Sequence, residues 1–127
     1  MIGLDHLRNQ NISNVVVHDA ARPFIRQGEI RELIDASRRC LYAQFHLKLL
    51  NGLLMKGEEG YEVVDREKYI ELVTPMIIDY RLAISLFENN LTNENCEIIP
   101  FLEKMKINYE LLEGSRFLRK ITTIDDL

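Results

Sequence analysis

The stretch that most constrains the fold is VVVHDAARP, which occupies residues 15–23. It begins with three β-branched residues, Val15–Val17, a run typical of a strand buried on both faces of a parallel sheet. An acidic and a basic side chain, Asp19 and Arg22, follow directly. Because open α/β sheets bind ligands at the carboxyl ends of their strands, we expect a binding site just after this strand.

The surrounding sequence predicts a Rossmann-like, three-layer α/β domain. A helix is expected over Gly28–Arg39, with Ile30, Leu33, Ile34 and Ser37 on its buried face. We also expect helical residues before residue 9, a helix over 78–89, and another that starts between Cys96 and Ile99 and buries Met105. Strands are expected at 42–50, 61–64, 109–113 and 118–122, and a turn at 56–60 makes a hairpin of the region around it.

Composition narrows the class of protein. The chain has 127 residues, enough for one domain, and 46% of them are hydrophobic. Its net charge of −4 argues against a nucleic-acid partner, since the phosphate backbone favours a basic face. No stretch has the apolar length of a signal peptide or a membrane span. Cys40 and Cys96 lack metal-ligand spacing, so we expect no metal site, reduced thiols and a cytoplasmic protein.

The residues after the first strand allow two interpretations. Asp19 has the oxygen ligands to engage a substrate hydroxyl or a magnesium ion, and Arg22 can bind a phosphate through its guanidinium. The small Ala20 and Ala21 would let a ligand approach the backbone. The structural alternative is an acid and base pair that caps a turn, with Pro23 ending the strand. These residues alone do not choose between the two.

Several motifs in the same order point to one family. HDAARPFI at 18–25 resembles a motif of the cytidylyltransferases that act on 2-C-methyl-D-erythritol 4-phosphate or on ribitol 5-phosphate. Arg66 precedes Thr74 by eight residues, as the arm arginine of that family precedes the threonine of its TPQ strand. LLEG at 111–114, Lys120 and ITTIDDL at 121–127 are similar to the closing segment of the family. The resemblance spans nearly the whole chain, as a partial domain over 1–127 with a β-arm at roughly 45–68.

The resemblance implies transfer of CMP from CTP to a sugar-alcohol phosphate, with release of pyrophosphate and with Mg²⁺ accompanying CTP. Arg66 and Lys120 match catalytic residues that position the substrate phosphate, Arg66 from the partner subunit of a homodimer joined through the arm. Asp19, Ala20, Arg22 and Thr74 would bind the polyol. The structural alternatives are a solvated charge for Arg66, an edge-strand position for Lys120 and a turn cap for Thr74.

The chain also departs from the family pattern. It has no counterpart of the N-terminal glycine-rich loop that binds the triphosphate, so we expect little affinity for CTP and negligible turnover from these residues alone. Residues 47–54 lack the DT(I/L)K stretch, and Met76 replaces glutamine after Thr74-Pro75. These departures favour the makers of CDP-ribitol over the isoprenoid enzymes. The first hypothesis is a truncated cytidylyltransferase; the alternative is a non-catalytic dimerisation module derived from that family.

Overall fold

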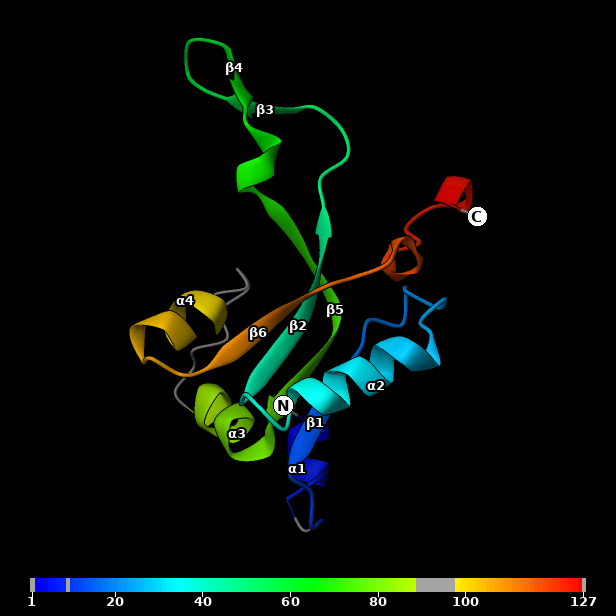
Figure 1. Cartoon of the computed structure of the whole chain (residues 1–127), viewed down its shortest axis with the longest axis vertical. Helices are drawn as coiled ribbons and strands as arrows, with labels where there is room; N and C mark the ends of the chain where they lie inside the picture. Colours follow the sequence, from blue (N-terminus) through cyan, green and yellow to red (C-terminus); the bar gives the residue numbers. More distant parts are fainter. Residues whose placement is uncertain (1, 9, 89–97, 127) are drawn as a thin grey trace.

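A mixed four-stranded sheet forms the centre of the molecule. The computed structural model describes residues 2–8, 10–88 and 98–126. The strand order is β1-β5-β2-β6, in which β5 pairs antiparallel with both β1 and β2, and β2 pairs parallel with β6. The bounds are β1 Asn14–Val17, β2 Tyr42–Lys48, β5 Ile70–Asp79 and β6 Tyr109–Glu113. Together with the helices, this sheet confirms the predicted α/β class (Figure 1).

Helices cover both faces of the sheet. Helix α2 (Gln27–Ala36) packs Leu33 against strand residues such as Phe45 in one buried cluster. Helices α3 (Tyr80–Glu88) and α4 (Ile98–Lys104) form a second cluster with Tyr42 on the opposite face (Figure 1). The short α1 (Ile2–His6) adds Leu4 to this second cluster. The three layers therefore follow from a sheet with apolar side chains on both faces.

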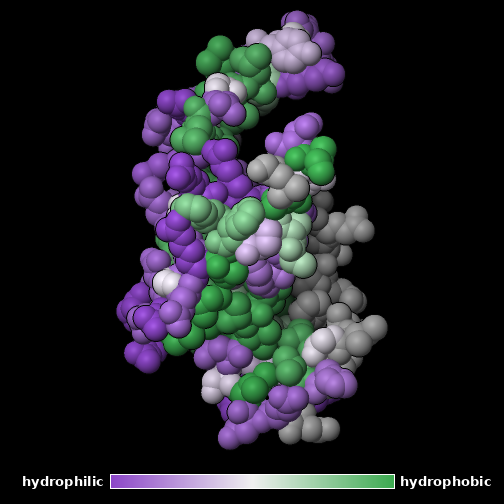
Figure 2. Space-filling view, turned by 90° about the vertical axis from the view of Figure 1, so that its right-hand side faces the viewer, coloured by the Kyte–Doolittle hydropathy of each residue, from purple (hydrophilic) through white to green (hydrophobic). Residues whose placement is uncertain are grey.

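A two-stranded arm projects from this body. It consists of β3 (Leu53–Lys56) and β4 (Tyr61–Val64), joined by the predicted turn, where the Gly57 amide donates to the Gly60 carbonyl at 2.8 Å. Gly60 has a φ of 148°, which only glycine adopts without strain. Figures 1 and 2 show the arm standing away from the body. Large apolar side chains are exposed on it: Leu54, Met55, Tyr61 and Val63.

The prediction for the first strand was wrong in two respects. β1 lies at the edge of the described sheet and runs antiparallel to β5, rather than between parallel neighbours. Val16 and Val17 are each 41% exposed. β-branched residues favour an extended backbone in parallel and antiparallel sheets alike. A run of three valines is also too short to show whether buried and exposed side chains alternate along the strand. The strand itself was predicted correctly, but its place in the sheet was not.

The predicted buried face of helix α2 was correct only in part, because Leu33 is buried and Ile30 and Ser37 are half-buried but Ile34 is not buried. The buried residues of the helix are Glu29, Leu33 and Ala36, whereas Ile34 is 44% exposed. The helix also ends at Ala36 rather than Arg39. The reason is that the Glu29 carboxylate has two hydrogen-bonding partners, so a charged residue takes a place that hydrophobic patterning assigns to an isoleucine.

Strand β5 was not predicted from the sequence because it contains a proline. Its ten residues include Pro75, so the periodicity did not predict this strand, and Thr74 lies within it rather than capping a turn. The pairing of β2 with β5 shifts register between Gln44 and Phe45, whose partners are Met76 and Val73. Thr74 and Pro75 therefore form a bulge. At a bulge, the pairing of the strands does not need the N–H that proline lacks.

The remaining predictions had mixed outcomes. β6 has the predicted bounds, α1 confirms the early helix, and α3 starts at Tyr80, two residues later than predicted. The hairpin partner of β4 is β3, not the 42–50 strand. Residues 116–118 form a 3-10 turn instead of beginning a strand at 118–122. Helix α4 starts at Ile98, but Met105 lies beyond it and is exposed. Cys96 and Asn89 lie outside the described residues.

Two further features are the state of Cys40 and the character of the helices. Cys40 is a free, buried thiol whose pKa is raised, first by its burial and then by the nearby Glu110 carboxylate. Such a thiol is a poor nucleophile, as expected for a structural cysteine. Within the described part of the chain, none of the helices combines the length and apolar character that a membrane span requires.

Candidate functional site at the end of strand β1

The candidate site begins where β1 turns back over the sheet. The Arg22 amide donates to the Asp19 carbonyl at 2.9 Å, which closes a tight turn around Ala20 and Ala21. The Asp19 amide in turn donates to the Thr74 hydroxyl at 2.9 Å. Since Thr74 lies in the bulge of β5, the irregularity in that strand supplies a side chain that fixes the end of β1.

Arg22 joins this turn to the C-terminal part of the chain. Its side chain is only 9% exposed, and its Nη1 donates to the Leu118 carbonyl. Its Nε lies 3.8 Å from Asp19 Oδ2. A second link is the Ile121 amide, which donates to the Ala21 carbonyl at 2.8 Å. A buried guanidinium needs such partners, so Arg22 here serves to hold two segments together.

Lys120 completes the cluster. Its Nζ lies 3.2 Å from Asp19 Oδ2, and its side chain is 47% exposed. The pKa of Asp19 is lowered, first by the hydrogen bond from the Ala21 amide and then by Lys120 and Arg22. The carboxylate is therefore ionised at neutral pH and holds the ammonium group of Lys120 at the protein surface. A fixed ammonium with an exposed side is suited to binding an anionic group.

A buried carboxylate supports the segment that carries Lys120. Glu29 is 7% exposed and accepts hydrogen bonds from the Arg26 amide at 2.8 Å and from the Ser115 hydroxyl. Ser115 Oγ also accepts from the Phe117 amide at 3.3 Å, which caps the 3-10 turn before Lys120. Hydrophobic periodicity does not indicate this support. An Arg-x-x-Glu spacing at the start of a helix was the only available signal.

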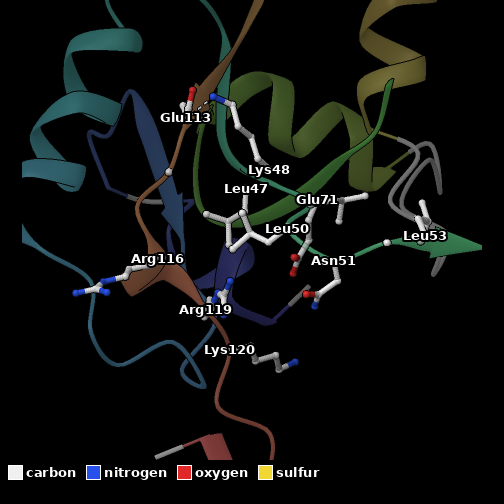
Figure 3. A pocket seen from close by; sticks show the side chains of 13 residues that line it. Leu47, Lys48, Leu50, Asn51, Leu53, Glu71, Glu113, Arg116, Arg119 and Lys120 are labelled. Atoms are coloured by element: carbon white, nitrogen blue, oxygen red, sulfur yellow. Dashed lines mark ion pairs between the residues drawn. The ribbon is translucent and has the colours of Figure 1, made fainter. Parts of the chain in front are cut away.

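A pocket of about 530 Å³ opens beside Lys120 at the root of the arm (Figure 3). Leucines from the end of β2 and the start of β3 line part of it, together with acidic, basic and amide side chains. We call it the arm-root pocket. Its lining residues are Leu47, Lys48, Leu49, Leu50, Asn51, Gly52, Leu53, Glu71, Glu113, Gly114, Arg116, Arg119 and Lys120.

The structure brings together four of the predicted site residues: Asp19, Arg22, Thr74 and Lys120. Ala20 is exposed in the same turn. Arg66 does not join this cluster. It lies in a 3-10 turn at the base of the arm, where its Nη1 donates to the Leu50 carbonyl and its Nε lies 3.6 Å from Glu67 Oε1. The catalytic and binding roles of all six residues stay predictions.

Asp19 is the residue expected to bind a magnesium ion. Its Oδ1 accepts from the Ala21 amide at 3.2 Å and its Oδ2 pairs with Lys120, so binding a cation would require this carboxylate to release its partners. Among the described residues, no three His, Cys, Asp or Glu side chains gather in a way that could hold a metal. These residues do not fit a resident Mg²⁺, and its association with CTP stays a prediction.

The solved structures most relevant here share this fold. The 4-diphosphocytidyl-2C-methyl-D-erythritol synthase of Anaerococcus prevotii has a TM-score of 0.81 at 23% identity, covering 98% of this chain and 57% of that one. The 2-C-methyl-D-erythritol 4-phosphate cytidylyltransferase of Thermus thermophilus has a TM-score of 0.78 at 25% identity, covering 98% and 63%. The fold is thus that of a nucleotidyltransferase domain.

Sequence comparison gives the family. The model described as "IspD: 2-C-methyl-D-erythritol 4-phosphate cytidylyltransferase" matches residues 1–127, and the chain belongs to this family. The bifunctional enzyme IspD/IspF of Paramagnetospirillum magneticum is 32% identical over 99% of this chain and 33% of its own length. The 2-C-methyl-D-erythritol 4-phosphate cytidylyltransferase of Thermotoga neapolitana is 29% identical over 98% and 55%. The chain spans about a third to a half of these relatives.

Proposed function

We propose that this chain provides the acceptor side of a cytidylyltransferase site. In the reaction, a phosphate oxygen of the acceptor attacks the α-phosphorus of CTP. A new P–O bond forms, the bond between the α- and β-phosphates breaks, and pyrophosphate leaves. The observation that carries the proposal is the contact of Lys120 with Asp19 at the end of β1, in a chain that matches the family model over its full length.

The residues of this site contribute position and charge. The ammonium of Lys120 would bind the acceptor phosphate and hold it near the incoming nucleotide, which lowers the entropic barrier to attack. Asp19 holds that ammonium in place and offers an ionised carboxylate to an acceptor hydroxyl. Arg22 contributes indirectly, because its bond to the Leu118 carbonyl fixes the segment that carries Lys120.

The acceptor we favour is 2-C-methyl-D-erythritol 4-phosphate, the substrate named in the family description. Ribitol 5-phosphate is the second candidate, because Met76 and residues 47–54 depart from the family pattern, and residues 47–53 line the pocket. Both compounds carry a phosphate at one end and hydroxyls along the chain. A choice between them is a difference in binding free energy that only direct competition measures.

We further propose a homodimer in which the arm of one subunit brings Arg66 to the other subunit's site. Support comes from the exposed apolar side chains of the arm, such as Val63 at 86% and Tyr61 at 69%. Exposed apolar groups of this kind mark association surfaces. The cytosol is the compartment that we propose, since the buried Cys40 is a free thiol.

The alternative function is a non-catalytic module that dimerises through the same arm. It is favoured by the exposed apolar side chains of the arm. This module would associate with itself or with a longer relative and would not bind CTP. The two functions therefore differ in nucleotide binding, which equilibrium dialysis of labelled CTP measures directly.

The test of the main proposal is transfer itself. The longest endogenous form of the protein is isolated, its intact mass is compared with 14.9 kDa, and it is incubated with CTP, Mg²⁺ and each acceptor in turn. We expect ³¹P NMR to show pyrophosphate and a new diphosphate diester with 2-C-methyl-D-erythritol 4-phosphate. A product with ribitol 5-phosphate alone would transfer the assignment to that acceptor. Absence of both products, with a stable dimer, would favour the module.

A further inference from the structure

The segment Arg116–Lys120 carries three cationic side chains, those of Arg116, Arg119 and Lys120. Lys120 pairs with Asp19, and Lys48 in the same pocket pairs with Glu113 at 2.9 Å. Within the described part of the chain, Arg119 forms no ion pair or side-chain hydrogen bond. Among the described residues, Arg119 therefore offers an exposed, unpaired guanidinium next to the ammonium of Lys120.

Arg119 also lies between two hollows of the surface. One is the arm-root pocket. The other, of about 450 Å³, is lined in part by Phe24, Phe117 and the carboxylates Asp125 and Asp126. Arg116, Arg119 and Lys120 line both. Figure 3 shows Arg119 and Lys120 extending from the same stretch of chain, whereas Arg116 points away from Leu50 and Asn51.

Arg116 is already engaged in a different interaction. Its guanidinium carbon lies 5.3 Å from the centre of the Phe117 ring, and that of Arg26 lies 3.3 Å from the same ring. Stacking on an aromatic ring fixes these two arginines against the body. Arg119 therefore remains as the cation next to Lys120 that is available to a ligand.

The chemistry of the two cations selects a phosphate. A guanidinium presents two parallel N–H donors that match two oxygens of a phosphate group, while an ammonium acts as a compact charge on the same group. The volume of the arm-root pocket falls within the range of about 300–1,000 Å³ typical of small-ligand sites. Asn51 and Glu71 line the same pocket, and their side chains suit hydroxyl groups rather than a second anion.

We propose that Arg119 forms, with Lys120, a phosphate-binding subsite at the mouth of the arm-root pocket. For Lys120 this rests on the proposed function, whereas Arg119 has no role in that proposal. The phosphate group belongs either to the polyol acceptor or to the nucleotide. Because Arg119 can bind two oxygens at once, it sets how strongly the chain discriminates a phosphate ester from the same compound without phosphate.

The test is a binding titration of the ¹⁵N-labelled chain, followed by NMR, with inorganic phosphate as the first probe. We compare Arg119→Gln with the control Arg38→Gln. The guanidinium of Arg38 is also exposed, and its Nη1 lies 3.1 Å from Oδ1 of Asp35, a residue of α2. Phosphate is expected to shift the amide signals of residues 116–120. We expect Arg119→Gln to weaken binding about tenfold, equivalent to about 1.4 kcal/mol, and Arg38→Gln to leave it unchanged.

Further arms identify the source of the phosphate. Ribitol 5-phosphate, 2-C-methyl-D-erythritol 4-phosphate, unphosphorylated ribitol and CTP are titrated in turn. A polyol phosphate that binds more tightly than inorganic phosphate identifies the acceptor, and tighter binding of CTP identifies the nucleotide; both support the subsite. Phosphate binding that depends on Arg119 without any gain from either polyol supports the subsite while removing support for the proposed function.

Three results would overturn the subsite. The first is an unchanged dissociation constant in Arg119→Gln when Lys120→Gln has lost binding, which leaves the proposed function intact. The second is a set of phosphate-induced shifts confined to residues outside 116–120. The third is equal binding of ribitol and ribitol 5-phosphate, since a site built on two cations must prefer the charged compound.

Discussion

The turn at the end of β1 and the arm differ in how they hold their predicted functional cations. At the turn, Arg22 is buried and bonded to Leu118, and Lys120 is held by Asp19, so each charge depends on residues distant in sequence. At the base of the arm, Arg66 is half-exposed and contacts the Leu50 carbonyl and the adjacent Glu67. The body thus positions its charges through its own core, whereas the arm presents a charge outward.

Because of this difference, we expect substitutions in the two regions to affect stability and function differently. Substitutions at the turn should disturb both, because the same contacts fix the fold and the site. Substitutions in the arm should leave the fold unchanged and affect only what the arm binds. Exposed ion pairs contribute about 0–1 kcal/mol, whereas breaking a buried charged contact costs several times more.

The largest expected effect is from Arg22→Ala. The change leaves the Leu118 carbonyl without its donor and removes one of the two cations beside Asp19, so we expect a loss of about 3 kcal/mol in the free energy of unfolding. Denaturant titration followed by circular dichroism measures it. Arg66→Ala is the matched control in the arm, expected within about 0.5 kcal/mol of the wild type. Equal losses in the two variants would erase the contrast between body and arm.

The next effect is from Gly114→Ala. A methyl group at Gly114 would lie 2.9 Å from Leu118 Cδ1 and 3.3 Å from the His46 carbonyl oxygen, so either the buried Leu118 side chain or the segment leading to Lys120 must shift. Overpacking of this kind costs about 1–3 kcal/mol. Gly52→Ala, next to the arm, has no atom within 4 Å of the added methyl and should be close to neutral. Thermal unfolding of both variants compares them, and an unperturbed Gly114→Ala would show that this segment tolerates movement.

A third effect concerns activity rather than stability. In the longest form of the protein, Arg66→Ala should reduce kcat/KM for the acceptor at least tenfold, about 1.4 kcal/mol, with no change in melting temperature. The reason is that a surface arginine brought to a partner's site contributes to binding the substrate and nothing to its own fold. Mixed dimers of Arg66→Ala and Lys120→Ala subunits provide the control, because one complete site per dimer should restore part of the activity. Full activity of Arg66→Ala homodimers would remove Arg66 from the site.

The smallest expected effect is the change with pH in the stability that the turn at the end of β1 contributes. The pKa of Asp19 is lowered in the folded chain, so its ionised contacts stabilise the fold above the ordinary carboxyl range near 3.8 and this contribution is lost as the pH falls through the folded pKa. The gap in melting temperature between wild type and Asp19→Asn should therefore close in acid.

Asp126 provides a companion to Asp19. Hydrogen bonds from the amides of Thr122 and Thr123 lower its pKa to about 2, so the gap for Asp126→Asn should close between about pH 4 and pH 2. The β3–β4 pairing of the arm consists of backbone hydrogen bonds, and its amide signals should change less over the same range than those of residues 118–121. If the difference in melting temperature between wild type and either variant instead grew as the pH fell, the predicted direction of the effect would be contradicted for that residue.

The sequence predicted the elements better than their environments. β6 and the turn of the arm have strong local signals, and both were confirmed. The edge position of β1, the bulge at Pro75 and the burial of Glu29 depend on contacts with distant segments, which residue patterns do not record. A charged residue can be buried when its partners are present, and only the folded chain shows those partners.

The same distinction applies to the site. The family motifs led to Asp19, Arg22, Thr74 and Lys120, and the structure places these four together. The motifs did not lead to Ser115 or Arg119, because neither matches a family pattern. Local periodicity also failed around Lys120, where residues 118–122 have β-branched and apolar character but no partner strand.

The central claim is that Lys120, fixed by Asp19, binds the acceptor phosphate. The most direct measurement is the rate of CMP transfer from CTP by the longest form of the protein, comparing Lys120→Gln with Lys104→Gln, an exposed lysine at the end of α4. The account predicts at least a tenfold loss in kcat/KM for the acceptor in Lys120→Gln and wild-type kinetics in Lys104→Gln. Equal kinetics in the two variants would contradict it.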